Sequence, residues 1–188
     1  MKRFLKILGI LLLILLLFRG SIFRNLITYS NIGTRDKFDI THPKLLEKIQ
    51  LESSNKSMTI EKIVQISRSI TTQELSFTTT QISRNPNDLF ISKKANCVGY
   101  AAMFNSIANY LIQSNHLELK YAANHRIGRL ELLGFNLHAF FNSPFFRDHD
   151  YNEIIDLQKR NTLAVDPSVT DYLGIDYVSK RDLESLEN

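Results

Sequence analysis

The chain has 188 residues, of which 44% are hydrophobic and 22% are charged, a balance typical of one globular domain with a full core. Its net charge of +4 is concentrated at the N-terminus, because five of the 23 Lys and Arg residues lie in the first 24 positions, which contain no acidic residue. The rest of the chain carries 18 basic against 19 acidic residues, which excludes the clustered positive charge that nucleic-acid binding requires.

The first 28 residues predict a membrane anchor or an export signal. A basic start precedes an uninterrupted apolar run from Ile7 to Phe18, which has the length of a secretory signal rather than of a full membrane span. No small-residue cleavage site follows, and Lys6 and Arg19 can extend their charges to the two interfaces. We therefore favour an uncleaved single-pass signal anchor over a cleaved leader and a secreted protein, or over a buried helix. Either form of export places the body on the extracytoplasmic side.

The body begins with helical patterns. Residues 29–42 are polar and predict a linker between the anchor and a folded domain of residues 43–188. Pro43 suits the first turn of a short helix, and apolar residues then recur at helical spacing from about residue 59 to 71. The polar stretch 71–90, which contains a proline, predicts the end of this helix and a loop.

The stretch "KKANCVGYAAMFNSIANYL" holds the only cysteine of the chain, Cys97, at the start of a predicted helix that extends to about Gln113. Residues 117–143 then alternate loosely and are broken by a Gly-Phe-Asn turn, which predicts two antiparallel strands. A third short strand is predicted at "NTLAVDPS". Helices followed by antiparallel strands indicate an α+β fold in which the nucleophile helix packs on a small antiparallel β-sheet.

A polar segment, residues 142–160, lies between the second and third predicted strands. We interpret it as an insertion with a short helix near residues 153–158. It contains the run "RDHD", which ends at Asp150 and includes His149. No pair of these residues has the spacing of a helical or knuckle metal site, so we interpret the run as a solvated loop and expect no metal.

Cys97 can act as a nucleophile if its surroundings support it. A helix N-terminus stabilises a thiolate through unpaired N–H groups and the helix dipole. The thiolate also needs a base within hydrogen-bond reach and a third group that fixes the tautomer of that base. His138 in "LHAFF" and Asp166 in "VDPS" are the candidates, because adjacent strands would place them on one face. The alternative is that Cys97 is a small buried apolar residue and that the other two are ordinary strand and turn residues.

The segments "ANCVGYAAMFNSIANYL", "LHAFF" and "AVDPS", in this order, resemble the cysteine, histidine and aspartate motifs of the transglutaminase-like superfamily, which is similar to papain in architecture. The resemblance covers roughly residues 60–175. It implies Cys97 as the nucleophile, His138 as the general base and Asp166 as the group that orients the histidine. The spacing between His138 and Asp166 is long for the family, and the 142–160 insertion would account for the excess. The chain also lacks the Trp that often follows the family's histidine.

The resemblance implies acyl transfer from a peptide or glutamine-type amide through a thioester, with hydrolysis favoured over transamidation because water is always available. The backbone N–H of Cys97 is one expected oxyanion donor, and Asn96 is a candidate for another. The expected partners are a protein or peptide substrate and the membrane, without cofactor, metal or nucleic acid. The rival hypothesis is a catalytically inactive module of the same fold that binds a peptide or protein partner.

Overall fold

The computed structural model describes residues 2–54, 57–80, 83–142 and 147–181. The helices are α1 (Lys2–Leu26), α2 (Pro43–Ser53), α3 (Ile60–Glu74), α4 (Pro86–Ser92), α5 (Cys97–Ser114) and α6 (Pro167–Leu173), with a short 3-10 helix, η1 (Leu137–Phe140). The strands are β1 (Ile27–Thr34), β2 (Ser76–Phe77), β3 (Lys94–Ala95), β4 (Tyr121–Leu132), β5 (Phe135–Asn136), β6 (His149–Asp156), β7 (Asn161–Val165) and β8 (Ser179–Arg181). The expected α+β class is confirmed.

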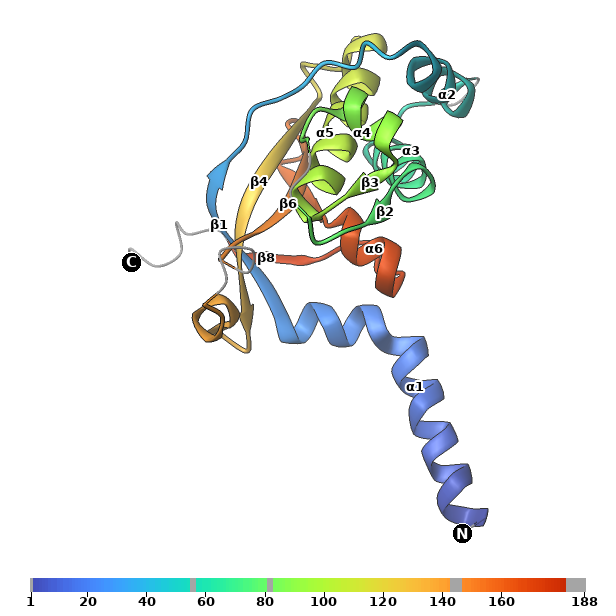
Figure 1. Cartoon of the computed structure of the whole chain (residues 1–188), viewed down its shortest axis with the longest axis vertical. Coiled ribbons are helices and arrows are strands. Elements are labelled where there is room, and N and C mark those ends of the chain that lie inside the picture. Colours follow the sequence, from blue (N-terminus) through green and yellow to red (C-terminus); the bar gives the residue numbers. More distant parts are fainter. Residues whose placement is uncertain (1, 55–56, 81–82, 143–146, 182–188) are drawn as a thin grey trace.

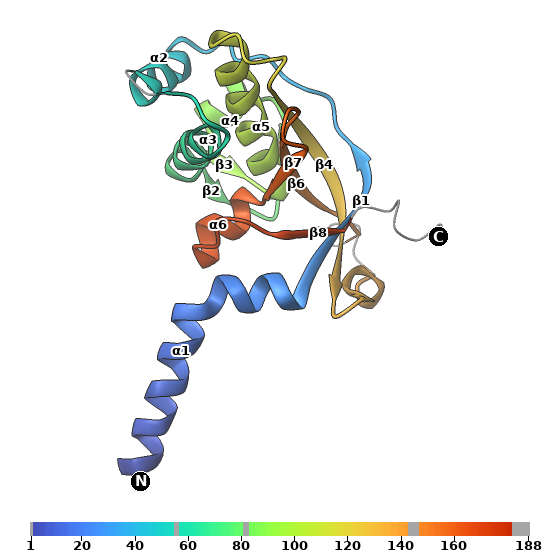
Figure 2. The ribbon, with the colours of Figure 1, turned by 180° about the vertical axis from the view of Figure 1, so that it is seen from behind.

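The main sheet has the strand order β7-β6-β4-β1-β8, and β5 pairs with the end of β4. Its pairs are antiparallel except for β1 with β8. The backbone N–H of Val178, just before β8, donates to the carbonyl of Ala164 in β7 at 3.0 Å. Because β7 and β8 are opposite ends of the sheet, this bond shows that the sheet curls toward closure (Figure 2).

Helices α2 to α6 lie together beside the sheet, and α5 packs between the sheet and α3 (Figure 1). The main core fills this interface and includes fully buried side chains such as Ile63, Phe104, Leu111 and Ile154. Each such side chain stabilises the fold by about 1.5–3 kcal/mol relative to its exposed state.

The N-terminus of α5 is fixed by its own sequence. The side chain of Asn96 caps the helix by accepting the backbone N–H of Gly99 at 3.1 Å. A Cβ at Gly99 would lie 2.9 Å from the Cβ of Ala95 and 3.2 Å from a methyl group of Leu89. Glycine at this position therefore lets α4 and β3 approach the first turn of α5, which holds Cys97 in place.

The polar residues that predicted a linker include a central strand. β1 (Ile27–Thr34) lies between β4 and β8, with Tyr29 and Ser30 buried. The residues over this part of 29–42 are therefore a strand and not a linker. The difference has a simple reason, because strand pairing uses backbone groups and does not require the apolar alternation that sequence patterns detect.

The segment interpreted as an insertion also contains a central strand. β6 (His149–Asp156) lies between β4 and β7, so the helix expected over residues 153–158 is wrong. Its polar residues Asp150 and Asn152 are fully buried, and each has a hydrogen-bond partner on a neighbouring element. Residues 143–146 of the same segment lie outside the described residues.

Helix α1 stands clear of the body over its N-terminal part (Figure 1). Within the described residues, the stretch Lys6–Leu26 is the one that is long and apolar enough to cross a membrane, a test that a signal sequence also passes. Where α1 meets the body, the guanidinium of Arg19 donates to the carbonyl oxygens of Leu173 at 2.6 Å and Gly174 at 3.3 Å. Gly174 ends α6 with a φ of 61°, and a Cβ there would lie 2.7 Å from this guanidinium. Arg19 therefore ties α1 to the end of α6.

The core accounts for a first prediction. Ile63→Ala removes a fully buried side chain from α3 and should lower the free energy of unfolding by about 2–5 kcal/mol. Ile91→Ala is the matched control, because Ile91 is 69% exposed and its loss should cost less than about 0.5 kcal/mol. Denaturant unfolding followed by circular dichroism measures both, and equal effects would contradict this description of the core.

Candidate active site

Three side chains lie in series at the start of α5. Cys97 is the first residue of this helix and is 8% exposed. His149 Nε2 lies 2.6 Å from Asp166 Oδ2, and His149 lines the same hollow as Cys97, whose nearness raises the pKa of the imidazole. Because Nε2 faces the carboxylate, Nδ1 is the ring nitrogen that remains for the thiol. The series is thiol, imidazole and carboxylate, which is the arrangement that an activated cysteine nucleophile requires.

The sheet topology explains why these residues meet. β6 and β7 are antiparallel, with Asn152 opposite Val165, so the start of β6 and the end of β7 lie at the same end of the sheet. His149 is the first residue of β6, and Asp166 directly follows β7. The N-terminus of α5 lies at this end too, which brings Cys97 to the imidazole.

Asp166 is held by donors from several elements. Its Oδ1 accepts the N–H of Ser168 at 3.0 Å, the hydroxyl of Ser168 at 2.6 Å and the N–H of Val169 at 3.2 Å, which makes it the N-cap of α6. Its Oδ2 accepts the hydroxyl of Tyr29 at 2.7 Å in addition to His149. Burial raises the pKa of this carboxyl, but His149 and these donors lower the pKa by a larger amount, so that it lies below its ordinary value. Asp166 is therefore a fixed carboxylate.

Tyr29 is a member of the site that sequence reasoning missed. It is fully buried on β1, and its ring packs edge-on against Tyr151 at 5.2 Å and His149 at 5.9 Å. Burial first, and then the neighbouring Asp166, raise the pKa of Tyr29 well above its ordinary value. The phenol therefore stays protonated and donates to the carboxylate. Its signal in the sequence was weak, because it lies in a polar segment directly after the apolar helix.

His149 is biased toward its charged form. Burial alone lowers its pKa, but the charge and hydrogen bond of Asp166, followed by the contact with Cys97, raise the pKa well above the ordinary value. An imidazolium beside a thiol is the environment that stabilises a reactive thiolate. The pair therefore has the electrostatic arrangement of a nucleophile and its base.

His138, the predicted base, occupies a different place. It lies in η1 rather than on a strand, and its Nε2 accepts the backbone N–H of Leu130 at 2.9 Å. The residue that contacts Asp166 is His149, 17 positions before it in the chain. The structure therefore brings His149 to Asp166 where the sequence predicted His138, and the long spacing noted in the sequence was the available sign of it. His138 still lines the same hollow as Cys97.

Donors for an oxyanion are found at the start of α5. As the first residue of a helix, Cys97 has a backbone N–H without an intrahelical acceptor. The side-chain oxygen of Asn96 is used in capping, so only its amide nitrogen could serve. Lys93, just before this helix, pairs with Glu74, and its ammonium lies 3.6 Å from the ring centre of Phe90.

A second polar cluster supports the start of β6. Asp150 is fully buried, lies 2.7 Å from Nε2 of His125 through Oδ2, and receives the guanidinium of Arg35 on both oxygens. Burial raises the pKa of Asp150, but His125 and Arg35 lower the pKa by a larger amount, so that it lies below its ordinary value. The solvated-loop interpretation is therefore wrong for Asp150. Because Asp150 follows His149 directly, this cluster restrains the position of the imidazole.

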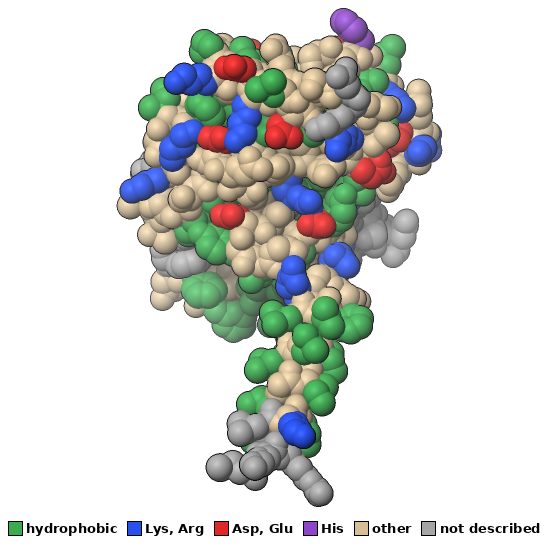
Figure 3. All heavy atoms as spheres, turned by 90° about the vertical axis from the view of Figure 1, so that its right-hand side faces the viewer, with side chains coloured by type: hydrophobic (Ala, Val, Ile, Leu, Met, Phe, Trp, Pro, Cys, Tyr) green, Lys and Arg blue, Asp and Glu red, His purple; other side chains and the backbone are tan. Residues whose placement is uncertain are grey.

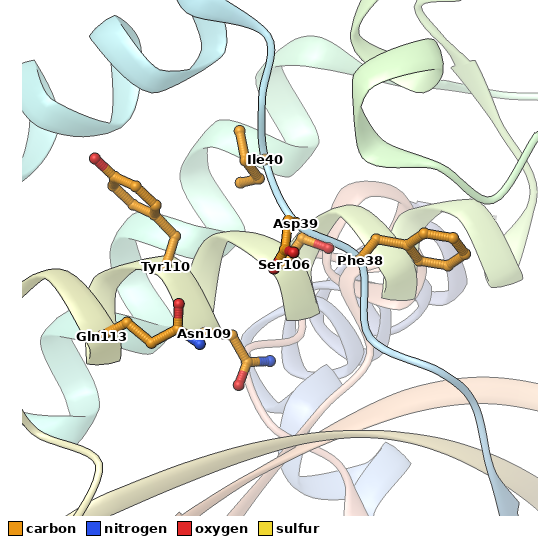
Figure 4. Close-up of a pocket in the computed structure, with 7 residues that line it drawn as sticks. All are labelled: Phe38, Asp39, Ile40, Ser106, Asn109, Tyr110 and Gln113. Carbon is orange, nitrogen blue, oxygen red and sulfur yellow. The ribbon is translucent and has the colours of Figure 1, made fainter.

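Two hollows lie along α5. One, of about 210 Å³, is lined by Phe77, Cys97, Leu130, Leu137, His138, Phe141, Asp148 and His149. The other, of about 230 Å³, lies where residues 38–40 cross the helix, and its lining contains no thiol or imidazole (Figure 4). Among the described residues, no three His, Cys, Asp or Glu side chains gather in a way that could hold a metal ion. The first hollow is therefore the candidate active site.

Comparisons with models of known protein families, with curated proteins and with solved structures give no match for this chain.

The raised pKa of His149 leads to a second prediction. Because the folded protein favours the imidazolium, the pair stabilises the fold below the ordinary pKa of about 6.5 and loses this contribution as pH rises through the raised value. Asp166→Asn keeps a capping side chain for α6 but removes the carboxylate charge that counters the effect of burial on His149. The pKa of His149 should therefore fall. NMR titration of the imidazole Cε1–H measures it, with Asp176→Asn as the exposed control. An unchanged His149 titration in Asp166→Asn would contradict this electrostatic description.

Tyr29 gives a third prediction. Tyr29→Phe keeps the ring packing but removes the hydrogen bond to Asp166, and should lower the free energy of unfolding by about 1.5–3 kcal/mol, the range for bonds to charged groups. Tyr110→Phe is the matched control, because its hydroxyl accepts only a long 3.3 Å bond from Gln50. Thermal unfolding of both variants tests the difference, and equal stability would show that the Tyr29 hydroxyl does not hold the carboxylate.

Proposed function

We propose that this chain is a membrane-anchored cysteine hydrolase or acyltransferase of the transglutaminase-like type, which acts on peptide or glutamine-type amide bonds. The observation that carries the proposal is the placement of Cys97 beside His149, which is hydrogen-bonded to Asp166, at the N-terminus of a buried helix. In this proposal His149 takes the role that the motif resemblance gave to His138. The order of cysteine, histidine and aspartate along the chain stays the same.

The reaction would proceed in two halves. The thiolate of Cys97 attacks the amide carbonyl carbon, His149 gives its proton to the departing amine, and the C–N bond breaks to leave a thioester. His149 then takes a proton from water, the hydroxide attacks the thioester, and the carboxylic acid leaves as the C–S bond breaks. The N–H of Cys97 would stabilise the oxyanion in both halves. Asp166 holds the imidazole in the required orientation, and Tyr29 holds Asp166.

The membrane part of the proposal rests on α1. Its apolar side chains from Ile7 to Phe18 are exposed (Figure 3). Basic residues precede the apolar run and favour an orientation with the N-terminus inside. The body would then lie on the extracytoplasmic side, directly attached to the membrane helix. Hydrolysis is favoured over transamidation, because water is always available as the acceptor.

The test is the pH dependence of alkylation of Cys97 by iodoacetamide in the full chain, beside His149→Ala and His138→Ala. An unperturbed thiol reacts with a midpoint near 8.5, and an imidazole-paired thiolate reacts well below it. We expect rapid labelling at about pH 6 in the parent chain and in His138→Ala. We expect labelling to be slower by roughly 10- to 100-fold in His149→Ala, because the thiolate fraction falls by this order.

Other outcomes have definite meanings. An alkylation midpoint near pH 8.5 in all three proteins would contradict the catalytic proposal and favour the catalytically inactive binding module. Loss of labelling in His138→Ala with retention in His149→Ala would return the role of base to His138.

A further inference from the structure

Two further hollows continue from the candidate active site toward the membrane helix. The first, of about 390 Å³, shares Phe77 and His149 with the Cys97 hollow and is otherwise lined by Ser168, Val169, Tyr172 and Leu173. The second, of about 220 Å³, shares Leu173 with it and lies against Leu15, Ile22, Phe23 and Leu26 of α1. The three hollows therefore share lining residues in sequence from Cys97 to α1.

The connecting walls are mainly apolar. The rings of Phe77 and Tyr172 meet edge to face at 5.5 Å, and Tyr172 and Leu173 are 59% and 47% exposed. The hydroxyl of Ser168 is used by Asp166, and the guanidinium of Arg19 is used by the end of α6. A charged substrate group would find little to pair with along this path, whereas an aliphatic chain would remove apolar wall from water.

The same side of the molecule carries further exposed apolar residues. Leu133, Phe135 and Phe140, at the turn after β4 and in η1, are 67–75% exposed. The N–H of Leu133 donates to the carbonyl of Leu26 at 2.8 Å, so this turn lies at the end of α1. Figure 3 shows hydrophobic side chains along the projecting helix and again on the lower part of the body beside it. The apolar path therefore opens where the anchor would place the bilayer.

We propose, building on the proposed function, that the acyl donor of this site carries a long aliphatic chain. The chain enters from the bilayer beside α1 and lies along Leu173, Tyr172 and Phe77, with the reacting carbonyl at Cys97. A lipid amide and an acylated peptide share this chemistry. Each methylene that enters the path should raise affinity by about fourfold, the value for a buried CH₂.

The experiment compares alkylation of Cys97 at pH 6 by iodoacetamide and by N-dodecyl iodoacetamide, with the full chain in uncharged detergent micelles. Both probes form an S–C bond and release iodide, so they differ only in the chain. We expect the dodecyl probe to react at least about tenfold faster, with the gain limited by its partition into micelles. Leu173→Glu and Tyr172→Glu should each lower the ratio of dodecyl to plain rates by about tenfold, since both place a charge on the path.

Leu119→Glu is the matched control, because Leu119 is 92% exposed in the turn before β4 and lines none of the three hollows. Its ratio of dodecyl to plain rates should equal that of the parent chain. The comparison with this control corrects for partition of the dodecyl probe into micelles. Protection by N-dodecanoyl ethanolamine would identify a lipid as the donor, and protection by an N-dodecanoyl tripeptide an acylated peptide.

The outcomes distinguish the proposed function from the aliphatic donor. Absence of labelling by iodoacetamide at pH 6 overturns the proposed function and this inference with it. Normal labelling at pH 6 with equal rates for the two probes, or with a dodecyl gain that Leu173→Glu and Leu119→Glu retain equally, overturns the aliphatic donor alone.

Discussion

A buried carboxylate destabilises a protein unless its oxygens accept hydrogen bonds or pair with a positive charge. Asp166 is buried at a place where the fold supplies these partners. Its donors come from β1, β6 and the first turn of α6, and it directly follows β7. The same contacts that satisfy the charge therefore join four elements at one end of the sheet. They also position His149, so stability and the geometry of the candidate site depend on the same group.

Burial and pairing together set the state of the site. Burial alone lowers the pKa of His149 and raises the pKa of Asp166. Each stabilises the charged form of the other, and the phenol of Tyr29 adds a donor that does not titrate near neutral pH. The arrangement therefore favours an imidazolium beside Cys97, in a hollow whose walls are mainly apolar.

Sequence patterns predicted the parts of the fold whose residues obey one periodicity. The helices α3 and α5 and the strand β7 lie close to their expected bounds, and Cys97 and Asp166 occupy the ends of elements where their motifs placed them. The apolar run after Cys97 shows helical spacing because α5 is buried on most sides, and Asp166 before a proline is a common start for a helix.

The missed parts share a physical cause. β1 and β6 are polar strands, stabilised by backbone pairing and by partnered buried groups such as Asp150, so they lack the apolar alternation that marks a strand. With β6 interpreted as a loop, His149 had no place in the sheet, and His138 was the remaining strand candidate. Tyr29 contributes through a contact 137 positions away in the chain, which no local pattern contains.

The direct passage from α1 into β1 has a consequence for where such a protein could work. β1 begins at the residue after α1 ends, and Tyr29 is its third residue. A body joined to a membrane helix without a spacer has no tether, so its reach above the bilayer equals its own height. A proteolytic cut just after Tyr29 would cost the sheet the pairing of its central strand and the carboxylate its phenol. Release from α1 by such a cut would therefore also disrupt the series of Cys97, His149 and Asp166.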